Sequence, residues 1–129
     1  YKTELFSLAK WRNKNLPKNV CLKKLDIIPE SIIEKEPTAE LKDNQKDTDS
    51  LPSYDKLDQI LEGLVEYELS TNELEKKGFS REEVKKVENL LYISEYKRRQ
   101  SAPGVKISLR NFGRDRRYPI TNKFRDKIE

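Results

Sequence analysis

The sequence has no histidine and no methionine, and it contains a single cysteine among its 129 residues. Because histidine is absent, Ser-His and Cys-His catalytic pairs are excluded, and so are most zinc sites. Cys21 has no second cysteine with which to form an internal disulfide. It lies in an apolar run, which predicts a small buried side chain rather than a nucleophile.

Long apolar runs are also absent. No stretch approaches the roughly 20 apolar residues that a membrane-spanning helix needs, and no secretory signal peptide is recognisable. We therefore expect a cytoplasmic protein without a membrane partner. The sequence also lacks an initiator methionine and begins inside an expected helix, so we expect it to be a piece of a longer protein.

Charge is what the sequence has in excess. Charged residues make up 39% of the chain and hydrophobic residues only 34%, which predicts a modest core in one domain or part of one. Residues 97–129 contain eleven basic and three acidic residues, a net charge of +8, whereas residues 1–96 have a net charge of −4. Charge alone leaves two interpretations of this basic end open, a solvated tail or a site for a phosphate-bearing partner.

The first part of the chain predicts two helices. Thr3 is a suitable N-cap for a helix over residues 3–13, and Pro17 follows as a stop. A short helix or turn is expected over residues 30–35. Its inward-facing residues are expected to be Ile32 and Ile33.

The middle of the chain, residues 53–100, is the expected helical region. A first helix is predicted over residues 54–67. Two successive capping boxes, Ser70–Glu73 and Ser80–Glu83, then predict a short helix closed by Gly78 and a longer helix that continues to the end of the region. The apolar residues expected on the buried faces of the first and last of these helices are Leu57, Ile60, Leu61, Leu64, Val65, Val84, Val87, Leu90 and Leu91.

Two less regular segments flank this region. Residues 36–52 combine acidic side chains with two prolines, which predicts an acidic loop that contacts ligands. Residues 101–129 form a basic tail, in which weak alternation over Val105–Leu109 predicts at most a short strand. The fold class expected for the chain is therefore mainly α.

Four motifs occur in one order along the chain. They are Lys2-Thr3, EPTAELKDNQKDTDSLPSYDKLDQIL over residues 36–61, EYKRRQ over residues 95–100 and FGRDRRYPITN over residues 112–122. In this order and at this spacing the chain resembles NAD+ synthetase, the ATP-dependent enzyme that converts deamido-NAD to NAD. The last two motifs resemble the glutamine-dependent, long form of that family.

The resemblance implies a place within a larger enzyme. The family's ATP-pyrophosphatase loop, of the Ser-Gly-Gly-x-Asp-Ser type, and its glutaminase domain have no counterpart in the sequence. Residues 1–129 would then be the C-terminal part of the synthetase domain, which has a doubly wound α/β fold (Rossmann-like, adenine nucleotide alpha-hydrolase). The implied reaction is adenylation of deamido-NAD by ATP with Mg2+, followed by attack of ammonia from glutamine. The chain alone is expected to be inactive, and the complete enzyme to be a homo-oligomer.

The resemblance also implies roles for single residues. Lys97 matches the family's lysine that contacts deamido-NAD, and a cation near a helix C-terminus is favoured by the helix dipole in any case. Thr38 matches the position whose hydroxyl contacts ATP, and a threonine after proline also fits an ordinary turn. Lys2 resembles the lysine that contacts the ATP phosphates.

A group of charged residues near the C-terminus supplies further candidates. Arg114, Arg116 and Arg117 are candidate phosphate contacts, because guanidinium groups bind phosphate bidentately. We expect Asp115 to hold these arginines in place, and we hypothesise that it lies near the point where ammonia reaches the site. Mg2+ needs few protein carboxylates, so no metal ligand is assigned. The loop acids that would approach Mg2+ or ribose hydroxyls, or would simply be solvated, are Glu40, Asp43, Asp47 and Asp49.

Two other function classes compete with this one. Residues 69–100 have the layout of a helix-turn-helix, with basic residues that would lie near DNA phosphates. However, the candidate recognition helix begins Arg81-Glu82-Glu83, and phosphate repels carboxylates at that end, so we expect no nucleic-acid partner. The other alternative is a non-catalytic helical module that binds another protein.

Overall fold

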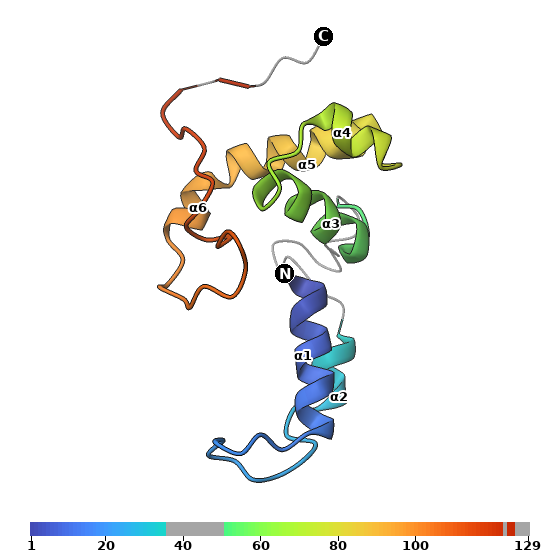
Figure 1. The fold of residues 1–129 in the computed structure, drawn as a ribbon, viewed down its shortest axis with the longest axis vertical. Coiled ribbons are helices and arrows are strands. Elements are labelled where there is room, and N and C mark those ends of the chain that lie inside the picture. Colours follow the sequence, from blue (N-terminus) through green and yellow to red (C-terminus); the bar gives the residue numbers. More distant parts are fainter. Residues whose placement is uncertain (36–50, 123, 126–129) are drawn as a thin grey trace, which may run out of the picture. The chain divides into compact units, whose positions relative to one another are not determined.

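The computed structural model describes residues 1–35, 51–122 and 124–125. The chain divides into two compact units, Tyr1–Asp58 and Gln59–Glu129, and its helices are drawn in Figure 1. In chain order the helices are α1 (Lys2–Lys14), α2 (Glu30–Glu34), α3 (Tyr54–Val65), α4 (Thr71–Lys76), α5 (Arg81–Ile93) and α6 (Glu95–Arg99). The mainly helical class is thus confirmed for the described part of the chain, whereas the predicted acidic loop lies almost entirely outside it.

The N-terminus of α1 is tied to the start of α3. The backbone N–H and the hydroxyl of Thr3 both donate to Oδ2 of Asp58, at 2.8 Å each. Asp58 is only 8% exposed, so these bonds satisfy a buried carboxylate. The prediction that Thr3 is the N-cap is therefore wrong. α1 begins at Lys2, and the Thr3 hydroxyl donates to a residue 55 positions later in the chain.

The connection after α1 is organised by hydrogen bonds rather than by apolar burial. The guanidinium of Arg12 donates to the backbone carbonyls of Asn15, Leu22 and Lys24, at 3.1, 2.7 and 3.2 Å. These three carbonyls lie outside any helix or strand, and Arg12 supplies the donors that they would otherwise lack. Cys21 is exposed on this loop, so the prediction of a buried cysteine is wrong.

α2 lies beside α1 (Figure 1), and its bounds agree with the prediction to within one residue. Ile33 is half-buried, as predicted. Ile32 is 63% exposed, so the prediction that it faces inward is wrong. A single turn of helix that packs on one side directs only one of two successive side chains toward its neighbour.

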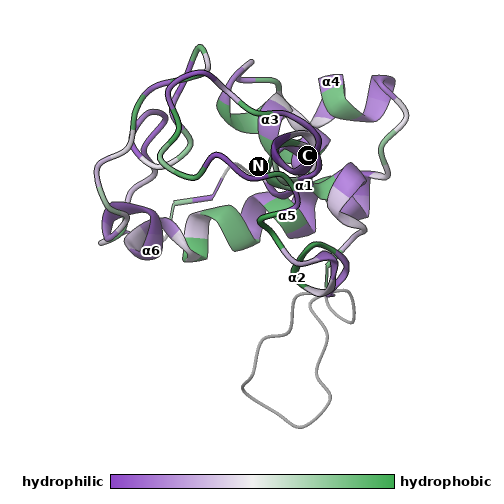
Figure 2. Ribbon diagram, turned by 90° about the horizontal axis from the view of Figure 1, so that it is seen from below, coloured by the Kyte–Doolittle hydropathy of each residue, from purple (hydrophilic) through white to green (hydrophobic). Residues whose placement is uncertain are grey.

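The core of the second unit is built from α3, α4 and α5. Figure 2 shows hydrophobic and hydrophilic segments alternating along α5, which is typical of an amphipathic helix. Gly63 allows α3 and α4 to approach closely, because a Cβ at this position would lie 2.7 Å from Cδ2 of Leu74. The predicted faces are confirmed, with the remaining predicted residues half-buried; the buried apolar residues of the three helices are Ile60, Leu64, Val65, Leu74, Val84, Val87, Leu91 and Tyr92.

The two predicted capping boxes differ in the structure. At the start of α4, the Glu73 carboxylate accepts from the backbone N–H of Ser70 at 2.8 Å, and the Ser70 hydroxyl accepts from the Glu73 N–H at 3.3 Å. The Ser70 hydroxyl also donates to the Glu73 carboxylate at 2.7 Å, and this bond, followed by that from the Ser70 N–H, lowers the pKa of Glu73. After α4, Gly78 adopts φ +97°, which confirms its predicted role. Ser80 is the N-cap residue of α5, but its side chain makes no cap hydrogen bond.

The helix that was predicted to continue to residue 100 is broken at Ser94. The Ser94 N–H donates to the carbonyl of Leu90 at 2.9 Å and ends α5, and the Ser94 carbonyl accepts from the N–H of Lys97 at 2.9 Å and begins α6. After the break, Glu95 and Arg98 are both buried, at 0% and 6% exposed.

The chain after α6 is irregular throughout its described residues. The predicted strand over Val105–Leu109 is absent. Val105, Ile107 and Leu109 are 84%, 85% and 74% exposed, so the weak alternation has no neighbouring sheet on which to pack. The prediction of a short strand is therefore wrong.

The two serines make a matched test of the capping hydrogen bond. Ser70→Ala is expected to lower the free energy of unfolding by about 1 kcal/mol, because it leaves an N–H of α4 without its acceptor. Ser80→Ala is expected to change it by less than about 0.5 kcal/mol, because that hydroxyl accepts no such bond. Urea unfolding followed by circular dichroism measures both. Equal losses for the two variants would contradict the assignment.

Candidate functional site

Glu95, the first residue of α6, is the centre of a cluster of arginines. Its side chain is 0% exposed, and Oε2 accepts from Nη1 of Arg98 at 2.7 Å. Oε1 accepts from Nε of Arg99 at 3.4 Å and from Nη1 of Arg117 at 3.3 Å. We call Glu95, Arg98, Arg99 and Arg117 the Glu95 cluster. A buried carboxylate needs such partners, because an unpaired buried charge is strongly destabilising.

Arg98 joins α6 to residues 110–118, which we call the basic segment. Nε and Nη2 donate to the carbonyl of Phe112, at 2.8 and 2.5 Å. Nη1 donates to the carbonyl of Arg116 at 3.0 Å, and Nη2 donates to the carbonyl of Asp115 at 2.9 Å. With the bond to Glu95, every N–H group of this guanidinium has an acceptor.

Two aromatic residues of the basic segment, Phe112 and Tyr118, contact Arg98 and α5. The Arg98 guanidinium lies 4.8 Å from the centre of the Phe112 ring. Tyr118 is buried, and its ring centre lies 4.4 Å from that of Tyr92 on α5. Burial raises the pKa of the Tyr118 phenol above its ordinary value. The Phe112 ring of the basic segment is therefore held against Arg98, and the Tyr118 ring is held against α5.

Lys97 and the predicted arginines remain at the surface around this anchor. Lys97 is exposed, and its Nζ lies 5.9 Å from the centre of the Tyr96 ring. Arg116 places its guanidinium 5.0 Å from the Tyr118 ring centre and its Nε 4.0 Å from a carboxylate oxygen of Glu68. Arg114, Arg116 and Arg117 are all exposed. Figure 2 shows α6 as a hydrophilic helix.

Such a surface suits an anionic ligand. Exposed guanidinium and ammonium groups on a fixed backbone bind phosphate with short, charge-assisted hydrogen bonds. The structure thus brings together in one unit, around α6, four of the residues that the sequence singled out: Lys97, Arg114, Arg116 and Arg117.

Asp115 has a different role from the one predicted. Its Oδ2 accepts from the backbone N–H of Asn111 at 2.8 Å and lies 3.1 Å from Nζ of Lys106. The bond from Asn111, followed by that from Lys106, lowers the pKa of the carboxyl. The prediction that Asp115 holds the neighbouring arginines is wrong, because the turn that begins at Asn111 directs the carboxylate back to its own backbone.

The other predicted site residues lie elsewhere. Lys2 is exposed on α1 in the first unit, with its Nζ 5.8 Å from the centre of the Tyr54 ring. Thr38 lies outside the described residues, as do Glu40, Asp43, Asp47 and Asp49. Within residues 1–35, 51–122 and 124–125, no group of His, Cys, Asp or Glu side chains is placed to hold a metal ion.

Sequence reasoning missed Glu95 and Arg98. Both lie in the EYKRRQ motif, in which a ligand role was assigned to Lys97 and Arg98 was only counted among the basic residues of 97–129. The signal that was present is the spacing: residues three apart share one face of a helix, so Glu95 and Arg98 are placed to pair. That this face is buried follows from the contacts with residues 112–116, which the spacing does not reveal.

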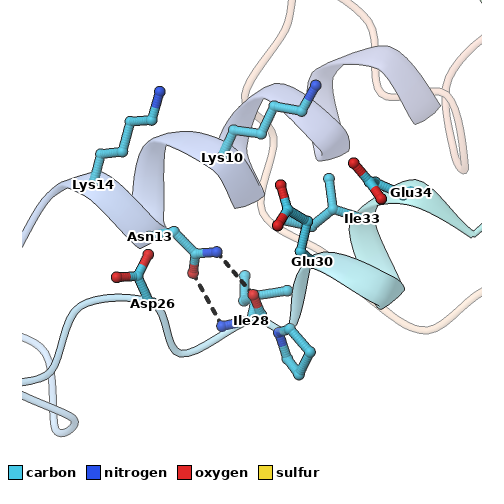
Figure 3. Close-up of a pocket in the computed structure, with 9 residues that line it drawn as sticks. Lys10, Asn13, Lys14, Asp26, Ile28, Glu30, Ile33 and Glu34 are labelled. Carbon is cyan, nitrogen blue, oxygen red and sulfur yellow. Dashed lines mark hydrogen bonds between the residues drawn. The ribbon is translucent and has the colours of Figure 1, made fainter.

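The first unit contains a pocket of about 890 Å³ between α1 and α2. Figure 3 shows the Asn13 side chain reaching from α1 to Ile28, where Nδ2 donates to the carbonyl at 2.8 Å and Oδ1 accepts from the N–H at 3.0 Å. Its charged lining residues carry both signs; they are Lys10, Lys14, Asp26, Glu30 and Glu34. No residue of this pocket was a predicted site residue.

The described part of the chain has no helix that is both long enough and apolar enough to cross a membrane.

Comparison with known proteins decides the family. The model of the NAD synthase family matches residues 1–101. The chain belongs to the NAD synthase family. The resemblance seen in the motifs is thereby confirmed.

Curated relatives of this NAD synthase chain extend the match beyond residue 101. The glutamine-dependent NAD(+) synthetase of Rhodobacter capsulatus is 50% identical over 127 residues, 98% of this chain and 23% of its own length. Those of Xanthomonas campestris and Thermotoga maritima are 48% and 44% identical over 96% and 99% of this chain, and 21% of each relative is covered. The match with the glutamine-dependent form therefore includes the basic segment.

A solved structure gives the same result. The glutamine-dependent NAD+ synthetase of Acinetobacter baumannii, determined in complex with ADP, is 42% identical and superposes with a TM-score of 0.53. The superposition covers 95% of this chain and 19% of that one. The chain thus spans about a fifth of the length of the NAD synthetases that it matches.

Proposed function

We propose that this chain is the C-terminal part of the synthetase domain of a glutamine-dependent NAD+ synthetase, a carbon-nitrogen ligase. The complete enzyme would amidate deamido-NAD to NAD, using ATP, Mg2+ and ammonia from glutamine. One observation carries the proposal: relatives of that name are 44–50% identical to the chain over nearly its whole length. The whole domain would have the doubly wound α/β fold, to which residues 1–129 contribute an acidic ligand loop (36–52), a helical region (53–100) and a basic tail (101–129).

The remainder of such an enzyme would supply what this chain lacks. The matched relatives are about five times as long, so the glutaminase domain and the pyrophosphatase loop would come from the other four fifths. We therefore propose that the isolated chain makes no NAD. We also propose that the complete enzyme is cytoplasmic and oligomeric.

Lys97 is the residue that we propose to bind deamido-NAD. Its exposed ammonium lies next to the buried Arg98, so the backbone that carries it is fixed while its side chain is accessible. The dinucleotide carries a pyrophosphate, and Arg114, Arg116 and Arg117 would neutralise phosphate charge beside it. These residues would orient the substrate rather than take part in bond making.

Lys2 and Thr38 are proposed to contact ATP. The ADP bound to the relative from Acinetobacter baumannii supports an adenine nucleotide as ligand of this family. Mg2+, when bound, would neutralise the charge of the ATP phosphates. The described residues hold no carboxylate cluster that fits it, so no step is assigned to the metal here.

The helix-turn-helix alternative gains no support from the structure. Arg81, at the start of the would-be recognition helix α5, donates to the side chains of Asn72 and Glu75, at 3.1 Å each. Its guanidinium is thus already bound at the end that would meet DNA.

Replacing Lys97 tests the proposed binding role in the full-length protein. Lys97→Ala is expected to raise the KM for deamido-NAD by about tenfold to a hundredfold, the effect of losing one charge-assisted hydrogen bond. The matched control is Lys86→Ala, an exposed lysine on α5, which is expected to leave the KM unchanged. Steady-state assays of NAD formation measure both. An unchanged KM in the Lys97 variant would contradict the assignment.

Replacing Asp115 tests its hypothesised place near the arriving ammonia. Asp115→Asn keeps an oxygen that accepts from the Asn111 N–H but removes the negative charge. We expect this variant to lose about tenfold or more in the rate of amide formation, with little change in ATP binding. Single-turnover NAD formation and ATP titration separate the two effects. Equal losses in both would contradict the hypothesis.

A further inference from the structure

The basic segment has no regular secondary structure with which to satisfy its backbone. Residues 110–118 form neither helix nor strand, so their inward carbonyls need donors from elsewhere. Three of them, at Phe112, Asp115 and Arg116, converge on the guanidinium of Arg98. One side chain thus holds the backbone of residues 112–116, five residues that include two candidate phosphate contacts, Arg114 and Arg116.

The same contact holds a conformation that is unfavourable by itself. Arg116 adopts φ +53°, in the left-handed region that residues other than glycine rarely occupy. Such a backbone persists only where its surroundings determine it. Here the carbonyl of Arg116 accepts from Nη1 of Arg98, the nitrogen that also donates to Glu95.

A lysine cannot replace this arginine. An ammonium has three donors on a flexible stem, whereas Arg98 uses five N–H groups in a planar fork to reach Glu95 and three carbonyls. Arg98 also stacks over the Phe112 ring, a contact that favours a flat guanidinium. Arg99 next to it makes fewer contacts. It is 49% exposed, contacts Glu95 at the longer distance of 3.4 Å and donates to the carbonyl of Tyr118 at 3.3 Å.

We infer that Arg98 is a positioning residue, which fixes the basic segment on α6 and thereby aligns Lys97, Arg114 and Arg116 for the dinucleotide. Arg98 itself does not touch the ligand, because its donors are already bound inside the protein. Glu95 acts with it by keeping the guanidinium in place. The inference rests on the proposed function for its substrate, but the fixing of the segment stands on the contacts alone.

The test uses the full-length protein with Arg98→Lys and Arg98→Ala, and with Lys86→Ala as the control, an exposed residue on α5 outside the Glu95 cluster and the basic segment. Amide hydrogen exchange of residues 110–118 is measured without ligand, and KM is measured for deamido-NAD and for ATP. Both Arg98 variants are expected to exchange faster in this segment. They are expected to raise the KM for deamido-NAD by about tenfold to a hundredfold, the effect of displacing binding groups by an ångström, while the KM for ATP changes by less than about twofold. Lys86→Ala is expected to resemble the wild type.

Several outcomes would overturn the inference. Wild-type exchange and KM in Arg98→Lys would show that the planar fork is not needed. A raised KM without faster exchange would show that Arg98 binds the substrate directly. If Arg98→Ala does not fold, Arg98→Lys decides the question, because it keeps a cation beside Glu95. A wild-type protein that does not use deamido-NAD would refute the proposed function, and faster exchange in the Arg98 variants would then still decide whether Arg98 fixes the segment.

Discussion

The buried ion pair between Glu95 and Arg98 is the interaction on which the C-terminal part of the molecule depends. The two side chains are 0% and 5% exposed, and their bond of 2.7 Å lies where a short helix meets an irregular segment. Removing one partner of such a pair leaves an uncompensated charge, which typically costs about 3–5 kcal/mol. The remaining hydrogen bonds of Arg98 all extend to the basic segment, and Glu95 also accepts from Arg117 of that segment, so the pair holds the segment in place.

This arrangement separates two tasks among neighbouring cations. Arg98 has all its donors bound inside the protein, whereas Lys97, one residue earlier, is exposed. A fixed backbone with a free ammonium beside it is what recognition of a charged ligand requires, because little ordering remains to be done on binding. The described basic residues after position 96 therefore do not form one solvated tail, because Arg98 is buried among them.

Local signals allowed much of the fold to be predicted. Apart from the break at Ser94, which was not predicted, the helices were placed to within a few residues. Apolar faces such as that of Ile60 and Leu64 recur at helical spacing, and the Ser70 box and Gly78 mark the ends of α4. The predictions for Thr3 and Asp115 were wrong because each side chain bonds to a backbone or carboxylate that spacing alone does not specify. The importance of Arg98 was missed because its burial depends on three carbonyls up to 18 residues away.

The proposed function requires this chain to complete an NAD synthetase site that other parts of a longer protein begin. The most direct measurement is NAD formation from deamido-NAD, ATP and glutamine, followed by chromatography, with the full-length protein and with residues 1–129 alone at equal concentration. We expect NAD formation by the full-length protein and none by the isolated chain. NAD formation by residues 1–129 alone, or its absence from the full-length protein, would contradict the proposed function.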